Sequence, residues 1–334
     1  MYFLLDFLHM LCIIYDMMSN FTASPGAVPF ISLVIPCFNE EATISLFYED
    51  ASRSLAAIGK PVEYIFVDDG SKDNTLKSMR QLASQDDAVH YISFSRNFGK
   101  EAALFAGLQA AQGEYIVTLD VDGQDPPSLI PQMLETVASG EYDCAGTRRT
   151  TRVGEPQIRS FFARCFYGLM EKITDIEVVD GARDFRLMNR KYLDALLTLR
   201  ERNRFSKGIF PWVGFKTKWF EYKNIERNAG YTKWSFWKLF LYSLDGIIAF
   251  SSKPLAIASV LGTLLFLAAL FLIFLIVIRK LIWGDPVSGW ASTVCIILFC
   301  SGVQLFTTGI LGQYIAKIHT EVKQRPHFII REVK

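Results

Sequence analysis

Short apolar runs alternate with longer stretches of helical pattern along the first part of the chain. The runs, rich in β-branched and aromatic residues, predict strands at 31–36, 62–69, 90–95 and 114–120. The stretches between them predict helices at 40–59, from about 73, and at 99–113. Because strands that alternate with helices form right-handed βαβ units, this order predicts an α/β fold with a mostly parallel sheet.

Two long apolar stretches follow, at residues 254–278 and 290–316. Each has the length of about 20 residues that a bilayer requires. Basic residues flank the outer ends of the pair, whereas the loop between them holds only Arg279 and Lys280. The positive-inside rule therefore predicts a multi-pass plasma-membrane protein whose large domain and C-terminal tail are cytoplasmic. The stretch 233–250 places basic and aromatic residues beside an apolar face, which favours a helix at the membrane interface.

Composition supports a soluble domain joined to a membrane segment. The 334 residues are 51% hydrophobic with a formal net charge of +1, and the mean hydropathy of +0.22 is raised mainly by the residues after 250. The near-zero charge is not typical of a nucleic-acid-binding protein. The six cysteines have no CxxC spacing, so neither a disulfide framework nor a zinc site is indicated.

Polar side chains follow the predicted strands at the points where they end. Asn39 and Glu40 follow the first strand, Asp68 and Asp69 end the second, and the acidic segment 120–125 follows the fourth. Ligands of open α/β sheets bind beyond the carboxyl ends of the strands. The pattern therefore predicts a binding site at this edge.

The segment DVDGQDPP, residues 120–127, indicates the chemistry of that site. Carboxylates at Asp120 and Asp122 can share a divalent cation whose other ligands are phosphate oxygens, and Gln124 can add a neutral oxygen. An EF-hand is excluded because Gly123 is the fourth residue and two prolines follow. A phosphatase with an aspartyl nucleophile is disfavoured, because such enzymes carry that aspartate after their first strand and this segment follows the fourth. A solvated turn after a strand is the alternative without a functional role. No dinucleotide or P-loop glycine motif occurs.

Seven segments form a motif set in a fixed order. They are VIPCFNEEATI (34–44), VDDGSKDNT (67–75), SRNFGKEAALFAGL (95–108), DVDGQDPP (120–127), GARDFRLMNRK (181–191), RNRFSKGIFPWVGF (202–215) and RNAGYTKWSFWKL (227–239). Together they resemble family 2 glycosyltransferases. The chain is similar to the branch of dolichol-phosphate mannose synthase and bacterial undecaprenyl-phosphate glycosyltransferases, from about residue 31 to 320. The resemblance implies a GT-A fold, a homo-oligomer, and inverting transfer of one sugar from a nucleotide diphosphate sugar to a polyprenyl phosphate.

The resemblance also implies roles for particular residues. Those that would hold the nucleotide sugar are Pro36, Asn39, Glu40, Asp68, Asp69, Asp120 and Asp122. Those that would hold Mg²⁺ or Mn²⁺ are Asp120, Asp122 and Gln124. Those that would meet the diphosphate or the lipid phosphate are Arg186, Lys207, Arg227, Thr232 and Lys233.

Asp184 is the candidate catalytic base or orienting group, with Asp122 as the second catalytic carboxylate. A structural ion pair or helix cap is the alternative for Asp184, because several arginines surround it in the sequence. The chain departs from the usual family spelling at Val121, Gly123 and Arg183, so the geometry there is open.

The donor is less determined than the reaction. UDP-glucose or UDP-N-acetylglucosamine is favoured because the RNRFSKG and TKWSF segments resemble bacterial members that use them. A GDP-mannose-dependent mannose synthase and an inactive membrane-anchored nucleotide-sugar binder are the alternatives, and a processive synthase would carry a QxxRW motif and more spans.

We therefore expect five regions. They are a dispensable extension at 1–29, a GT-A catalytic domain at 30–230, juxtamembrane amphipathic helices at 231–252, a two-helix anchor at 253–317 and a cytoplasmic tail at 318–334.

Overall fold

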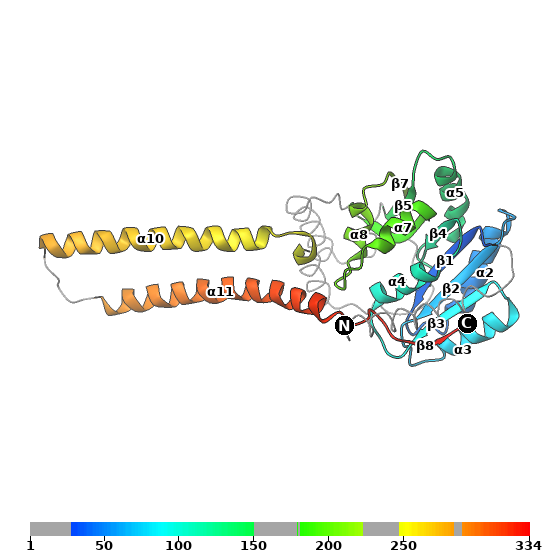
Figure 1. Cartoon of the computed structure of the whole chain (residues 1–334), viewed down its shortest axis with the longest axis horizontal. Helices are drawn as coiled ribbons and strands as arrows, with labels where there is room; N and C mark the ends of the chain where they lie inside the picture. Colours follow the sequence, from blue (N-terminus) through cyan, green and yellow to red (C-terminus); the bar gives the residue numbers. More distant parts are fainter. Residues whose placement is uncertain (1–27, 150–178, 180, 223–246, 284–288) are drawn as a thin grey trace, which may run out of the picture.

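The computed structural model describes residues 28–149, 179, 181–222, 247–283 and 289–334. Figure 1 shows a globular part built on one sheet and two long helices that project from it side by side. The expected extension at 1–29 and the juxtamembrane stretch at 231–252 lie almost wholly outside the described residues.

The first half of the sheet follows the predicted alternation closely. Its elements are β1 (Ile31–Cys37), α2 (Ile44–Ala56), β2 (Val62–Asp68), α3 (Thr75–Gln85), β3 (Val89–Phe94), α4 (Lys100–Ala110) and β4 (Tyr115–Thr118). β1 pairs in parallel with both β2 and β4, and β2 pairs in parallel with β3. The helix expected from residue 40 begins at Ile44, because Glu40 and Thr43 form a turn in which the Thr43 N–H donates to the Glu40 carbonyl oxygen at 3.0 Å.

The second half adds antiparallel strands. Its elements are η1 (Pro127–Leu129), α5 (Ile130–Ala138), β5 (Cys144–Arg149), β6 (Ala182–Asn189), α7 (Arg190–Thr198), α8 (Ser206–Trp212) and β7 (Thr217–Tyr222). β6 runs antiparallel to both β4 and β5. The strand order is β7-β5-β6-β4-β1-β2-β3-β8. The expected α/β fold with a mostly parallel sheet, followed by two apolar helices, is thus confirmed.

Both faces of the sheet are covered by helices, as the apolar central strands require. On β1, Ile31, Leu33 and Ile35 face a core formed with α2, α3 and α5, whereas Val34 faces α4 and α7. α4 lies so close to the sheet that a Cβ on Gly107 would overlap the Val34 side chain. The positions of the strand ends therefore rest on a core that is closed on both sides.

The C-terminal tail completes the sheet. β8 (Ile330–Val333) pairs antiparallel with β3, and the Tyr91 and Lys334 backbones exchange hydrogen bonds of 3.1 and 3.0 Å. Arg80 on α3 forms a salt bridge with Glu332. The predicted cytoplasmic tail is therefore part of the globular domain, because it supplies hydrogen-bond partners to an otherwise open edge strand.

α10 (Lys253–Trp283) and α11 (Trp290–Lys323) contain the two predicted apolar stretches, and α11 continues seven residues beyond the predicted end at 316. Their apolar side chains face outward: Phe266 is 62% exposed and Leu305 is 73% exposed. Both helices are long and apolar enough to be candidate membrane spans. At about 1.5 Å per residue, each exceeds the roughly 30 Å of bilayer hydrocarbon.

Candidate active site

An ammonium group joins two carboxylates beyond the end of β4. Lys100 Nζ lies 2.7 Å from an Asp120 oxygen and 2.6 Å from Asp184 Oδ2. The sheet register explains this meeting: Thr118 on β4 pairs with Arg186 on the antiparallel β6, which brings Asp120 and Asp184 level. The sequence motifs include Lys100 but did not predict a role for it. The position of Lys100 at the start of a predicted helix, close to the ends of the predicted strands, was the sequence feature that could have indicated such a role.

Lys100 and Asp184 stay charged near neutral pH. Burial by itself would lower the pKa of Lys100, but Asp120 and Asp184 raise it above its ordinary value. Burial by itself would raise the pKa of Asp184, but Lys100 and Lys207 hold it well below its usual range. The attraction between Lys100 and the neighbouring carboxylates thus outweighs the cost of their burial.

Asp122 and Gln124 lie on the same turn as Asp120. Burial, and then the charge of Asp120, raise the pKa of Asp122, and its Oδ1 accepts the Gln124 N–H at 3.1 Å. Gln124 Oε1 accepts a hydrogen bond from Arg149 at 2.8 Å. These are the oxygen donors that Mg²⁺ or Mn²⁺ prefers. Among the described residues no group of three acidic, histidine or cysteine side chains could hold a metal.

The three departures from the family spelling have structural reasons. Val121 is 4% exposed and packs in the core on the α2 face. Gly123 has φ +71°, the left-handed region in which glycine is favoured. Arg183 donates to both oxygens of the buried Asp125, at 3.0 and 3.2 Å, and Tyr222 donates to Asp125 as well. Asp125 therefore fixes the turn, while Asp120 and Asp122 are left at the site.

The loop after β1 is tied to the loop after β2. The Asn39 N–H donates to Ser71 Oγ at 2.9 Å, Asn39 Oδ1 accepts the Lys72 N–H at 2.9 Å, and the Glu40 N–H donates to Thr75 Oγ1 at 2.8 Å. Pro36, half-buried on β1, pairs with Val67 on β2. These predicted nucleotide contacts thus lie together at the carboxyl ends of two neighbouring strands.

Asp68 and Asp69 are almost completely buried, at 1% and 3% exposed. Asp68 accepts hydrogen bonds from the Ser71 N–H and from Ser93 Oγ, at 2.9 and 2.8 Å. Asp69 accepts the N–H groups of Phe98 and Gly99, at 2.6 and 2.9 Å. In this structure both carboxylates hold loops that border the site. Their contact with a nucleotide stays a prediction.

Gly70 is expected to be essential to that loop arrangement. It has φ +65°, and a Cβ there would lie 2.7 Å from the Asn97 nitrogen and closer still to the Arg96 backbone. Gly70→Ala should lower the free energy of unfolding by about 1–2 kcal/mol for the left-handed backbone, with about 1–3 kcal/mol more for the overlap. Denaturant unfolding of the full chain in detergent measures it.

Gly59→Ala is the matched control for this prediction. Gly59 has nearly the same φ of +63°, but no atom lies within 4 Å of the position that a Cβ would take there. It should therefore show the backbone cost alone. Equal losses in the two variants would contradict a steric role for Gly70.

The residues predicted to bind the diphosphate or the lipid phosphate fall into three groups. Lys207, at the start of α8, lies near enough to Asp184 to lower its pKa. Arg186 is 2% exposed, and its guanidinium carbon lies 4.5 Å from the centre of the Phe210 ring and 4.9 Å from that of Trp219. At this exposure a phosphate could not contact Arg186 without movement of the residues around it. Arg227, Thr232 and Lys233 lie outside the described residues.

Comparison with known proteins identifies the family of the chain. Residues 32–197 match the family described as Glycosyl transferase family 2. CsbB of Bacillus subtilis (strain 168) is 40% identical over 302 residues, which cover 90% of this chain and 91% of that protein. The SfII prophage-derived bactoprenol glucosyl transferase of Shigella flexneri is 41% identical over 304 residues, covering 90% of this chain and 97% of that one.

A solved structure is also similar. It is glucosyl-3-phosphoglycerate synthase from Mycobacterium tuberculosis in complex with Mn²⁺, UDP and phosphoglyceric acid, with a TM-score of 0.48 and 20% identity over 69% of this chain and 79% of that chain. The sequence relatives alone settle the family, since their identity extends through nearly the whole chain. The chain belongs to glycosyltransferase family 2, and it is a glycosyltransferase.

Proposed function

We propose that the chain transfers glucose from UDP-glucose to undecaprenyl phosphate, with inversion at the anomeric carbon. The observation that carries this proposal is the meeting of Asp120 and Asp184 at Lys100, with Asp122 on the same turn, at the carboxyl edge of the sheet. Relatives about 40% identical over most of their length are named bactoprenol glucosyl transferases, which supports this donor and this lipid acceptor.

In the proposed displacement reaction one bond forms and one bond breaks. An oxygen of the acceptor phosphate bonds to the anomeric carbon of glucose, while the bond from that carbon to the β-phosphate oxygen breaks and UDP leaves. The acceptor is already largely ionised at neutral pH, so little proton transfer is needed. Asp184, with its lowered pKa, is suited to hold Lys100 in place rather than to accept a proton.

The main requirement is to stabilise the negative charge that develops on the leaving diphosphate. Lys100 and Lys207 are cations beside the acidic cluster that could do so. A divalent metal would be held by Asp120, Asp122 and Gln124, and when bound it would supply further charge stabilisation to the diphosphate. Adding Mg²⁺ or Mn²⁺ separately after EDTA treatment, and comparing the recovered transfer, distinguishes the two ions.

The two long apolar helices support a membrane location for this chemistry. α10 begins and α11 ends at the globular part (Figure 1), so both basic flanks lie on that side. By the positive-inside rule the catalytic domain is cytoplasmic in a multi-pass plasma-membrane protein. The product would be a lipid-linked glucose for use in the cell envelope. A homo-oligomer stays a prediction from the family resemblance.

The test is a transfer assay with the full chain in membranes. Membranes are incubated with undecaprenyl phosphate and radiolabelled UDP-glucose, UDP-N-acetylglucosamine or GDP-mannose, and the lipid extract is counted. We expect label in the lipid from UDP-glucose, loss of label with EDTA, and recovery with added Mg²⁺ or Mn²⁺.

Membranes without the protein provide the background. If only GDP-mannose labelled the lipid extract, the protein would be a polyprenyl-phosphate mannose synthase and the proposed use of UDP-glucose would be wrong. Binding of UDP-glucose without any labelled lipid would indicate an inactive nucleotide-sugar binder, and full transfer in EDTA would remove the metal from the proposal.

A further inference from the structure

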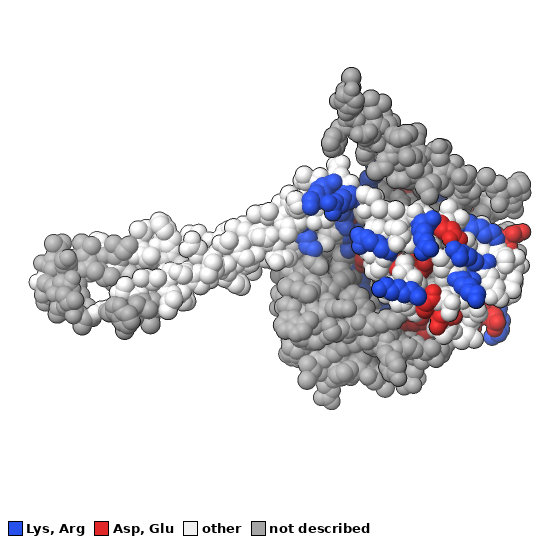
Figure 2. Space-filling model, turned by 90° about the horizontal axis from the view of Figure 1, so that it is seen from below, with Lys and Arg blue, Asp and Glu red and all other residues white. Residues whose placement is uncertain are grey.

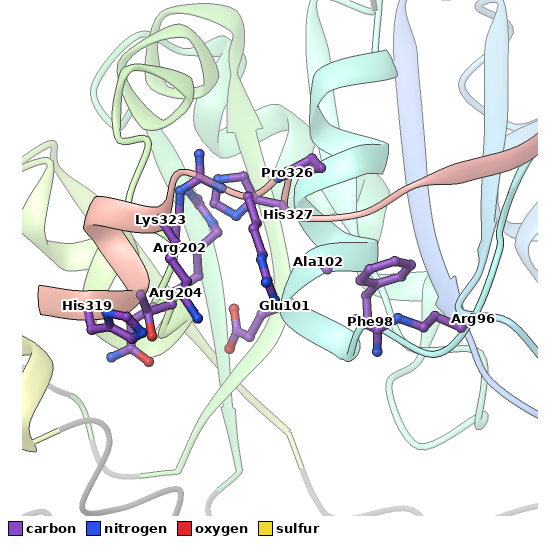
Figure 3. Close-up of a pocket in the computed structure, with 13 residues that line it drawn as sticks. Arg96, Phe98, Glu101, Ala102, Arg202, Arg204, His319, Lys323, Pro326 and His327 are labelled. Atoms are coloured by element: carbon purple, nitrogen blue, oxygen red, sulfur yellow. The ribbon is translucent and has the colours of Figure 1, made fainter. Parts of the chain in front are cut away.

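A cavity lies where α11 meets the globular domain. Its volume is about 400 Å³, within the usual size of small-ligand sites. It is lined by the end of α11 and the tail after it, by the loop before α8, and by the first turn of α4 with the segment before it. In Figure 3 the end of α11 lies on one side of it and Phe98 and Arg96 on the other. Asp120, Asp122, Asp184 and Lys100 do not line it.

The lining is strongly basic. Arg96, Arg202, Arg204, Lys323 and Arg325 contribute positive charge, two histidines join them, and Glu101 is the lining carboxylate. Glu101 accepts hydrogen bonds from the Ser206 backbone and hydroxyl. Within the described parts of the chain, none of the five cations forms a salt bridge. Figure 2 shows Lys and Arg side chains gathered where the helices join the globular part.

The arginines of the loop before α8 are held in position. Glu321 on α11 accepts the backbone N–H groups of Arg202 and Asn203, at 2.8 and 3.1 Å. The Arg204 guanidinium donates to the Leu199 carbonyl at 2.6 Å and lies 4.2 Å from the centre of the Phe105 ring. These contacts hold the loop backbone and the Arg204 side chain before any ligand arrives, which lowers the entropy cost of binding.

One donor in this cavity is unsatisfied. Arg202 Nη1 is buried and has no hydrogen-bond partner among the described residues. Burial, followed by the charges of Arg204 and Arg202, lowers the pKa of His327 to about 4. A buried donor without an acceptor is costly, and the charge around the cavity is positive, so an anionic group in the cavity would be stabilised by the surrounding cations.

The position of the cavity indicates where such an anion comes from. The candidate span in α11 is Ile296–Lys323, 28 residues long, whereas about 20 residues of helix cross the hydrocarbon layer. Lys317, His319 and Lys323 lie in the last turns of this span, next to the globular domain. The Tyr314 hydroxyl donates to the Ser251 carbonyl at 2.6 Å, which ties the start of α10 to the same level. The cavity thus lies at the level of lipid head groups.

We propose that this cavity binds the phosphate head group of a membrane lipid, at a site separate from the acidic cluster that performs transfer. Basic pockets beside membrane helices on the cytoplasmic side bind anionic head groups by the same means. Occupancy would hold α11, the tail and the loop before α8 together, and so hold the catalytic edge of the sheet at a fixed height above the membrane. The proposal does not depend on which sugar or acceptor the enzyme uses.

The test is lipid binding by the full chain in detergent, read by native mass spectrometry. Dioctanoyl phosphatidylglycerol, undecaprenyl phosphate, phosphatidylcholine and inorganic phosphate are titrated separately. We expect either anionic lipid to bind more tightly than phosphatidylcholine or inorganic phosphate. Lys323→Gln with Arg325→Gln, both at exposed positions, should weaken binding about 30-fold, since each cation contributes about 1 kcal/mol.

Arg53→Gln with Lys77→Gln is the matched control, because it removes two exposed charges from α2 and α3, away from the cavity. Its lipid affinity should equal that of the unmodified chain. Unchanged binding in the Lys323 and Arg325 double variant would overturn the site. Inorganic phosphate binding as tightly as either lipid would overturn the lipid as its source. The binding assay does not require sugar transfer. Lipid binding can therefore be observed even if the proposed transfer reaction is wrong, and the transfer reaction can be observed even if this lipid site is absent.

Discussion

Replacing Asp122 with asparagine is expected to reduce transfer by about a thousandfold while leaving the protein at least as stable. The substitution removes one of two carboxylates that would bind the metal and diphosphate, and the loss of one such electrostatic contact costs about 10² to 10³ in rate. Burial and Asp120 raise the pKa of Asp122, so its charge is unfavourable in the folded chain. A neutral amide relieves that repulsion.

Transfer rate and thermal midpoint, measured on the same preparation, test both parts of this prediction. Asp87→Asn is the control because Asp87 is an exposed carboxylate of the same domain, and it should change neither quantity. Retained transfer in Asp122→Asn would assign Asp122 to the turn alone. A lower midpoint would mean that its charge stabilises the fold.

Replacing Lys100 with methionine is expected to reduce transfer by about a hundredfold at every Mg²⁺ concentration. The ammonium group is bound to Asp120 and Asp184 at once, so its loss leaves two neighbouring carboxylates without this cation and removes a positive charge next to the diphosphate. Because the Lys100 side chain is 42% exposed, water screens the pair. The free energy of unfolding should fall by only about 1 kcal/mol.

Lys191→Met serves as the control, since Lys191 is 71% exposed and its nitrogen lies 3.9 Å from Asp143, away from the acidic cluster. It should transfer at the normal rate. If high Mg²⁺ restored the transfer rate of the Lys100→Met variant, the role of Lys100 would be limited to supplying positive charge at Asp120 in place of the metal. A normal rate at low Mg²⁺ would exclude Lys100 from the reaction.

The strands and helices of the first half were predictable because each depends on neighbouring residues. The run ISLVIPC is buried along nearly its whole length as β1, and VEYIFVD is buried as β2 after its first residue. Continuous apolar runs of this length between helical stretches are characteristic of central parallel strands. The same local logic predicted α10 and α11, whose length and composition alone make them candidate spans.

The candidate site was predictable only in part. The strand ends correctly placed Asp120, Asp122, Asn39 and Glu40 at one edge, because parallel strands share that edge. The sequence could not show that Asp68 and Asp69 are buried in loop contacts. Nor could it show that Arg186 lies between two aromatic rings. Those outcomes depend on which loops and rings pack above each side chain.

Pattern and motif by themselves determined the α/β alternation, the two apolar helices, the family and the acidic turn, because these follow from residues close together in the chain. Only the tertiary structure decided the contact of Lys100 with Asp184, 84 residues apart, and that of Arg80 with Glu332, 252 residues apart. Sheet register brings the first pair together, and the return of the tail from α11 brings the second. Such long-range contacts depend on how the whole sheet packs. They cannot be predicted from any short stretch of the sequence.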